Sequence, residues 1–174
     1  AYYDKPGGVK ITVKANLYKK GVAKIAVKSD TETILYLRIP EWTKEFTVTV
    51  NGDKAAFTKK NGYAAISVKN GDKITVSMPI KVKKRILNGK VEFERGPIVL
   101  ARDDRFGEDI RLPVKTAEKS GGAVAKLVKN TAFYTNETVK VKTKDGEITL
   151  CDYSSAGKNY DSENCNMAVW NEIG

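Results

Sequence analysis

In the segment Phe46-Thr47-Val48-Thr49-Val50-Asn51-Gly52, apolar and polar side chains alternate up to an Asn-Gly pair. A period of two places alternate residues on one face of a β-strand, and Asn-Gly is the strongest short signal for a two-residue hairpin turn. Alternation followed by a Gly-containing turn recurs at 61–62, 70–72 and 88–89. Short strands separated by turns every 8 to 12 residues or so predict an all-β fold, an antiparallel β-sandwich of jelly-roll or Ig-like type.

The pattern changes after Ala101, where a charged segment, 102–107, and a polar, Gly-containing segment, 115–122, follow. We therefore expect a β-sandwich domain over 1–103 and a smaller extension of strands and loops over 104–174, which completes or flanks the sandwich. The extension has too few apolar residues for a core of its own. The segment 98–101 is apolar on both faces, which predicts a central strand buried on both sides.

Composition excludes several classes of protein. The chain has 174 residues, a net charge of +10 and no histidine. Catalysis by Ser-His-Asp or Cys-His groups and His-ligated metal sites are therefore excluded for this chain. The longest apolar run, at 98–101, is far too short to span a bilayer. The basic residues are mostly lysines spread along the chain, so we expect no nucleic-acid partner.

The carboxylates do not predict a catalytic site. Glu92 and Glu94 lie two residues apart on one strand. Val91 and Phe93 define the opposite face as the core, so we expect both glutamates to face solvent or a partner. An oxygen-rich group around Asp152 lacks the spacing of a calcium loop. We therefore predict no catalytic residue, metal or cofactor.

Exposed aromatic residues on a β-sandwich are typical of carbohydrate-binding surfaces. The candidates here are Trp42, Trp170, Tyr153 and Tyr160. Trp42 follows a strand-ending proline, and an alternative interpretation places it as a plug at the end of the sandwich. Arg95 precedes a Gly-Pro bend and is a candidate to lock a loop or a neighbouring domain through a carboxylate.

The chain has two cysteines, Cys151 and Cys165. Two are too few for a disulfide scaffold. In an oxidising compartment they could close a small loop near the C-terminus, which would stabilise it by about 3 kcal/mol. The alternative is that they are two unrelated buried thiols.

Three segments, taken together in order and spacing, resemble the C-terminal β-sandwich region of glycoside hydrolase family 127, the β-L-arabinofuranosidase-like proteins. The resemblance covers residues 2–101 well and the remainder in patches. The segments are Leu37-Arg38-Ile39-Pro40-Glu41-Trp42 with Val48-Thr49-Val50-Asn51-Gly52; Gly62-Tyr63 through Asn70-Gly71-Asp72 to Met78-Pro79; and Glu94-Arg95-Gly96-Pro97-Ile98-Val99.

The resemblance implies a non-catalytic role for this chain. Family members carry an (α/α)6 barrel ahead of the sandwich, where catalysis is attributed to a cysteine nucleophile, a glutamate and zinc. This chain contains no such barrel, and we interpret Glu163-Asn164-Cys165 as a chance likeness to the family's Glu-x-Cys element. No catalytic or metal residue is carried over, and we predict that the chain alone is not an enzyme.

The expected function is thus a non-catalytic accessory domain that packs against the catalytic barrel of a parent glycoside hydrolase. The alternative is a stand-alone carbohydrate-binding module that uses exposed aromatics to bind a plant-type oligosaccharide. The resemblance favours a periplasmic or secreted location in a bacterium, with the cytoplasm as the alternative.

Overall fold

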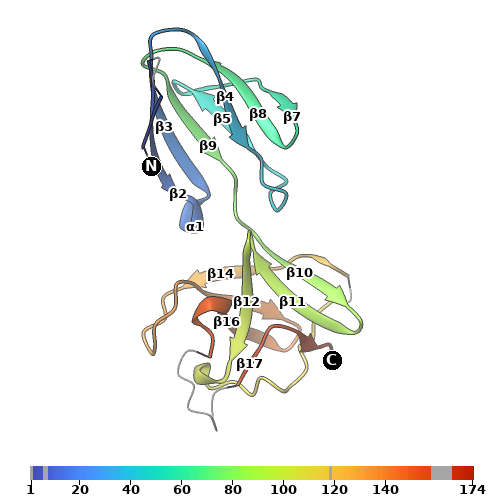
Figure 1. Ribbon diagram of the computed structural model, residues 1–174. Coiled ribbons are helices and arrows are strands. Elements are labelled where there is room, and N and C mark those ends of the chain that lie inside the picture. The colour runs from blue at the N-terminus through green and yellow to red at the C-terminus, as the bar shows by residue number, and fades with distance from the viewer. Residues whose placement is uncertain (1, 6–7, 118, 158–165) are drawn as a thin grey trace. The chain divides into compact units, whose positions relative to one another are not determined.

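The computed structural model describes residues 2–5, 8–117, 119–157 and 166–174. The chain folds into two compact units, Ala1–Ile80 and Lys81–Gly174 (Figure 1). The named strands that pair in the described residues do so in antiparallel fashion, which confirms the predicted all-β class. None of the described helices has the length and the apolar composition that crossing a bilayer requires.

The first unit is built from two sheets. Their strand orders are β1-β2-β3-β9-β5-β6 and β4-β8-β7. The elements are β1 (Tyr2–Lys5), β2 (Val9–Asn16), a single-turn helix α1 (Leu17–Lys20), β3 (Val22–Ser29), β4 (Thr33–Arg38), β5 (Thr47–Val50), β6 (Asp53–Lys54), β7 (Thr58–Lys60), β8 (Tyr63–Val68) and β9 (Lys73–Ser77).

One apolar core joins these two sheets. Val27, Val48 and Ile74 reach it from the larger sheet, and Ile66 and Val68 from the smaller one. Each full burial of such a side chain contributes about 1.5–3 kcal/mol. The alternation seen in the sequence puts these residues on the inner faces, and a slip of one residue in any strand would turn them outward. The predicted sandwich is confirmed in this unit.

The Asn-Gly turns form as the sequence predicts. Asn51, Asn61 and Asn88 have φ of 53°, 49° and 49°, and the glycine after each also has a positive φ. Two successive residues with positive φ make the type I′ turn, whose twist matches that of the paired strands. The Asn51 side chain adds a long-range contact, because its Oδ1 accepts a hydrogen bond from the Lys73 N–H at 2.9 Å.

The second unit contains one large sheet, in the order β13-β10-β11-β12-β16-β15-β14, with β17 paired to β12 and β18 to β11. Its elements are β10 (Val82–Leu87), β11 (Lys90–Arg95), β12 (Ile98–Asp103), the 3₁₀ turn η1 (Asp104–Phe106), β13 (Gly121–Gly122), β14 (Ala125–Val128), β15 (Thr138–Thr143), β16 (Gly146–Asp152), the 3₁₀ turn η2 (Tyr153–Ser155), β17 (Met167–Ala168) and β18 (Asn171–Glu172).

The division between the units differs from the boundary expected at residue 103. Strands β10, β11 and β12 lie in the second unit, where β12 pairs with β16. Phe93 and Leu100 join Val139 and Leu150 in a core of this unit. Alternation and turn chemistry are the same on both sides of residue 80, so the sequence pattern does not indicate which sheet these strands join.

Two expectations about individual strands are wrong. Val99 on β12 is 36% exposed, so this central strand is not covered on both sides. Glu92 on β11 is only 3% exposed instead of facing solvent. Arg85 lies directly opposite Glu92 on β10 and forms an ion pair with it. The guanidinium of Arg85 also lies over the ring of Trp170, 5.2 Å from its centre.

Candidate functional site

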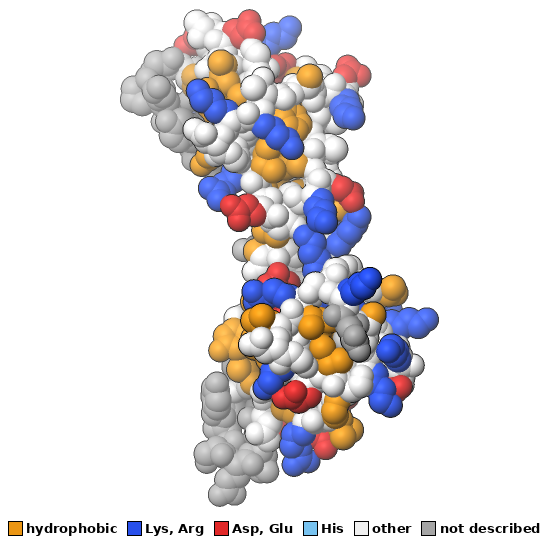
Figure 2. Space-filling view, turned by 90° about the vertical axis from the view of Figure 1, so that its right-hand side faces the viewer, with side chains coloured by type: hydrophobic (Ala, Val, Ile, Leu, Met, Phe, Trp, Pro, Cys, Tyr) orange, Lys and Arg blue, Asp and Glu red, His pale blue; other side chains and the backbone are white. Residues whose placement is uncertain are grey.

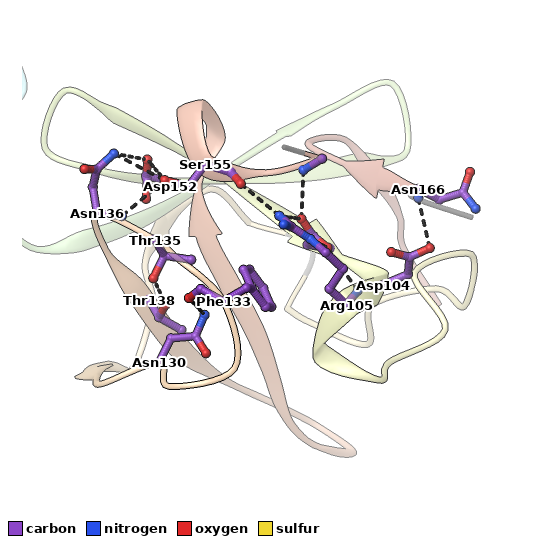
Figure 3. Close-up of polar contacts among 12 residues, drawn as sticks. Asp104, Arg105, Asn130, Phe133, Thr135, Asn136, Thr138, Asp152, Ser155 and Asn166 are labelled. Atoms are coloured by element: carbon purple, nitrogen blue, oxygen red, sulfur yellow. Dashed lines mark hydrogen bonds and ion pairs between the residues drawn. The ribbon is translucent and has the colours of Figure 1, made fainter. Parts of the chain in front are cut away.

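The candidate site of the second unit is a network of buried charges at the ends of β12 and β16. Asp152, the last residue of β16, is buried. Its Oδ1 accepts a hydrogen bond from the Glu137 N–H at 2.9 Å. Its Oδ2 accepts from the Ser155 hydroxyl at 2.9 Å and from Asn136 Nδ2 at 3.0 Å (Figure 3). Asp152 therefore fastens the segment before β15 to the turn after β16.

The hydrogen bonds to Asp152 determine its protonation. Burial opposes ionisation, but the donors from Ser154, Asn136, the Glu137 N–H and Ser155 outweigh it and hold the pKa of Asp152 below its ordinary value. A carboxylate that accepts several hydrogen bonds favours its charged form. Asp152 is thus a charged acceptor with its oxygens already engaged.

A second buried carboxylate, Asp103, ends β12 in a similar arrangement. Arg105 binds it with two parallel contacts, Nε to Oδ1 at 2.8 Å and Nη2 to Oδ2 at 2.6 Å. The Gly157 N–H donates to the same Oδ2 at 2.8 Å. Burial opposes ionisation here too, yet Arg105 and the Gly157 N–H hold the pKa of Asp103 below its ordinary value.

Arg105 connects the two carboxylates. Its Nη2 donates to the Ser155 carbonyl at 2.8 Å, and Ser155 in turn binds Asp152. Figure 3 shows Ser155 between Asp152 on one side and Arg105 on the other. The ring of Phe133 lies 4.0 Å from the Arg105 guanidinium, in the geometry of a cation–π contact. The network therefore joins η1, η2 and the loop before β15.

Arg95, which the sequence indicated as a loop lock, belongs to the same region. It is buried, and its Nη1 lies 2.7 Å from Oε1 of Glu137. Burial and the nearby charge of Asp152 raise the pKa of Glu137, although Arg95 acts in the opposite direction. The other oxygen of Glu137, Oε2, accepts no hydrogen bond from a described residue. Arg95 thus contacts the carboxylate of Glu137, in the loop before β15, through one oxygen.

Arg102 on β12 holds a further loop through backbone carbonyls. Its guanidinium donates to the carbonyls of Asp109 at 2.9 Å, Leu112 at 2.8 Å and Ile110 at 3.2 Å. Burial lowers the pKa of Arg102. A guanidinium has several donors in a fixed fork, so one side chain satisfies carbonyls that pair with no strand.

Cys151 lies between the two buried carboxylates in sequence and space. It is a free thiol, and it is fully buried on β16. Burial, together with the charges of Asp103 and Asp152, raises its pKa to about 12. A thiol with this pKa is protonated at neutral pH, and the thiolate is the reactive form. Cys151 is therefore a poor nucleophile. Its proposed disulfide partner Cys165 lies outside the described residues.

The aromatic candidates are divided between the two units. Trp42 is half-buried and packs against the core of the first unit. Trp170 is half-buried, with the Arg85 guanidinium 5.2 Å from its ring centre. Tyr153 on η2 is 53% exposed. Tyr160 lies outside the described residues.

Sequence reasoning missed most of the network. The sequence indicated only a charged segment after an apolar strand at Arg102, Asp103 and Arg105. Asn136 was not predicted as a site residue. A usable signal was present in Asp152-Tyr153-Ser154-Ser155, because Asp followed by Ser commonly closes a local side-chain turn. Among the described residues, no group of three His, Cys, Asp or Glu side chains is placed to hold a metal ion.

The family comparison finds a match that is confined to the first unit. Residues 3–80 match the model of the GH127 middle domain of β-L-arabinofuranosidases. The resemblance to family 127 is confirmed. The match ends at Ile80, where the first compact unit also ends. The sequence indicated similarity to a C-terminal sandwich region reaching residue 101, whereas the matching model is that of a middle domain and its match stops at residue 80. None of the curated proteins matches the chain.

Solved structures extend the likeness in fold to the whole chain. A GH127 β-L-arabinofuranosidase from Geobacillus stearothermophilus T6 is 20% identical with a TM-score of 0.75, and the match covers 100% of this chain and 32% of that one. A second GH127 β-arabinofuranosidase gives 17% identity and a TM-score of 0.74, with 100% and 33% covered. The chain therefore spans about a third of the length of these GH127 proteins.

Proposed function

We propose that the chain is a non-catalytic accessory part of a family 127 protein, in which it supports an (α/α)6 catalytic barrel. One observation carries this proposal. The middle-domain match fills the first compact unit and ends with it, while the GH127 proteins of similar fold are about three times as long as the region they share with this chain. An accessory role also agrees with the comparison at family level, which concerns a middle domain and not a catalytic one.

The chemistry of the described residues supports the same proposal. The ionised oxygens of Asp103 and Asp152 accept hydrogen bonds from the loops they hold, so they are not presented to a substrate. The thiol of Cys151 is buried and its pKa is raised to about 12. A catalytic group needs a pKa suited to its task and access to the reacting atoms.

A carbohydrate-binding module is the second candidate, favoured by one specific observation. Tyr134 and Tyr153 are 65% and 53% exposed. The Oδ1 of Asn136 accepts a hydrogen bond from the Tyr134 hydroxyl at 2.7 Å, and its Nδ2 donates at 3.3 Å to Ser154, the residue after Tyr153. Exposed aromatic rings beside amide and hydroxyl groups can stack on sugar rings. The two tryptophans do not offer such a surface, because each is packed against protein.

The test measures hydrolysis and binding on the same purified chain. Far-UV circular dichroism first confirms folding, and a full-length family 127 enzyme serves as the positive control. The accessory proposal predicts no release of 4-nitrophenol from 4-nitrophenyl β-L-arabinofuranoside above the background of a buffer blank. Turnover that scales with chain concentration and disappears in the Cys151→Ala variant would overturn it.

Titration calorimetry with arabino-oligosaccharides distinguishes the two candidates. The accessory proposal predicts no saturable heat. Saturable binding that the Tyr153→Ala variant loses, and that the control Tyr36→Ala variant keeps, would favour the module. Tyr36 is a suitable control because it is 55% exposed and lies on β4 in the other unit.

A further inference from the structure

Lys84 breaks the alternation of strand β10. Residues 82, 84 and 86 share one face of this strand, and the valine and isoleucine at its ends pack with the core of the second unit. Lys84 stands opposite the fully buried Phe93 on β11. An ammonium group in a row of core-facing apolar residues is costly to desolvate. Residues that break the local rule in this way often mark functional sites.

Lys84 lies in a pocket of about 300 Å³. Phe93, Ala123 and Val124 supply its apolar lining, and Thr116 and Thr143 supply hydroxyl groups. Two further lysines, Lys142 and Lys144, line the same pocket. This volume lies at the lower end of the range for small-molecule sites, which suits a ligand of about one ring.

The Lys84 ammonium is held in place within this pocket. It donates to Thr116 Oγ1 and to the Ala117 carbonyl, both at 2.8 Å. An ammonium has three N–H donors, so these two contacts leave one for a ligand. Burial, and then the charge of Lys144, lower the pKa of Lys84. The charges of Lys84 and Lys144 therefore act on each other at this pocket, which Lys142 also lines.

The carboxylates nearest to these lysines are engaged elsewhere. Glu147 stands opposite Lys142 in the β15–β16 pair, but its Oε1 bonds Lys126 at 2.8 Å. Asp145 adjoins Lys144, but its Oδ2 bonds Lys115 at 2.8 Å. Among the described residues, Lys84, Lys142 and Lys144 therefore form no ion pair with a carboxylate. An anion entering the pocket would supply the missing countercharge.

We propose that this lysine pocket (Lys84, Lys142, Lys144 over Phe93) binds a small organic anion, a carboxylate or phosphate carried on a body the size of one sugar ring. The apolar lining contacts the ring, and the ammonium groups bind the anion. Thr116 Oγ1 accepts from Lys84, and Thr143 Oγ1 donates to the Gly146 carbonyl at 3.3 Å, which leaves the first as a donor and the second as an acceptor for ring hydroxyls. The inference stands on the second unit alone and is independent of the accessory role.

The experiment titrates the ¹⁵N-labelled full chain with D-glucuronate, glucose 6-phosphate, inorganic phosphate and neutral D-glucose. Saturable amide shifts are expected with an anionic sugar at Thr116, Ala117, Ala123 and Thr143, and none with glucose. Glucuronate alone would identify a carboxylate ligand. Glucose 6-phosphate alone or together with inorganic phosphate would identify a phosphate ligand. No binding by any anion, or equal binding of glucose, would overturn the proposal.

Two variants test the lysines directly. Lys144→Met removes an exposed ammonium and should leave the fold intact, while weakening binding about tenfold, as expected for loss of one charged contact. Lys84→Met should weaken it at least as much. The matched control is Lys129→Met, which removes one positive charge from an exposed position of the same unit outside the pocket. Equal affinities of Lys144→Met and Lys129→Met would contradict the proposal.

Discussion

The two units bury different kinds of side chain, although both are antiparallel β structures. In the first unit the buried polar residues among those described are Ser29 and Asp72, and the remaining buried residues form the apolar core between two sheets. The second unit buries many more polar and charged residues: Glu92, Arg95, Arg102, Asp103, Thr116, Glu137, Thr138, Asp152, Ser155 and Asn171.

The connections explain this difference. In the first unit most connections are short, and Asn-Gly turns close two of its hairpins, β5–β6 and β7–β8, with two residues each. In the second unit long segments separate β12 from β13 and β14 from β15. Their backbone groups have no ladder partner, and buried backbone groups must be satisfied by other donors and acceptors. The charged side chains Arg102, Asp103 and Asp152 perform this task.

The distribution of charged side chains on the surface does not distinguish the two units. On the face shown in Figure 2, the Lys and Arg side chains of each unit are interspersed with acidic, apolar and uncharged groups. The instructive contrast between the units therefore lies in their interiors.

The largest expected effect comes from Arg105→Met in the second unit. It leaves Asp103 buried without its ionic partner, which costs about 3–5 kcal/mol of unfolding free energy. Urea unfolding is followed by tryptophan fluorescence, with Trp170 as the reporter of the second unit in a Trp42→Phe background. Trp42 reports on the first unit in a Trp170→Phe background, where no change is expected.

Arg111→Met is the matched control for this variant. Arg111 makes the same pair of contacts to Asp109, two residues earlier, with its Nε 2.9 Å from Oδ1, but the Arg111 side chain is 86% exposed. Exposed ion pairs contribute little. We expect no measurable change in unfolding, and an equal loss in both variants would show that burial is not what distinguishes the second unit.

A smaller effect is expected from Ile74→Val in the first unit. Ile74 is 1% exposed in the sandwich core. Removing one buried methyl group costs about 0.5–1.5 kcal/mol. Trp42 fluorescence during urea unfolding measures the loss. A change confined to the Trp170 reporter would contradict the assignment of this residue to a separate first core.

The smallest effect is a pH dependence of the second unit. The folded-state pKa values of Asp103 and Asp152 are lowered, so the stability they contribute is present above their unfolded pKa and is lost as the pH falls through the folded value. Between pH 5 and pH 4 the loss begins, at about 0.3 kcal/mol for each carboxylate. The raised pKa of Glu137 has the opposite sign, since it favours folding at lower pH.

The Glu137→Gln variant separates these contributions. With the opposing group removed, unfolding followed by Trp170 should show a steeper loss of stability between pH 5 and pH 4 than the natural chain shows. Asp152→Asn in the same background should reduce that slope. An unchanged slope in both variants would mean that these carboxylates are not the groups that titrate.

Much of the local structure was predictable because it depends on near neighbours. The Asn-Gly pairs at 51–52, 61–62 and 88–89 adopt the positive φ values that hairpins need. Arg95, beside a Gly-Pro bend, contacts one oxygen of the Glu137 carboxylate, 42 residues later. The partner itself was not predictable, because nothing in either local sequence specifies the other.

Local sequence patterns did not predict the burial of Glu92 or the contacts around Asp152. A glutamate in an alternating strand is assigned to the solvent face, yet the opposite Arg85 forms an ion pair with Glu92 and lies over Trp170. Asp152 gathers donors from the Glu137 backbone and the Asn136 side chain. Such contacts depend on segments far apart in sequence, so only packing brings them together.

The amino-acid sequence by itself determined the all-β class, the hairpin turns and the likeness to family 127. The all-β class and the turns follow from side-chain alternation and from the conformational freedom of residues adjacent in the chain. The likeness to family 127 rests on the resemblance of three segments in their order and spacing. The tertiary structure alone decided that the units divide after Ile80, which charges are buried in pairs, and that the Cys151 thiol stays protonated. Sheet membership, burial and electrostatic neighbours are properties of distant segments packed together, and no local pattern carries them.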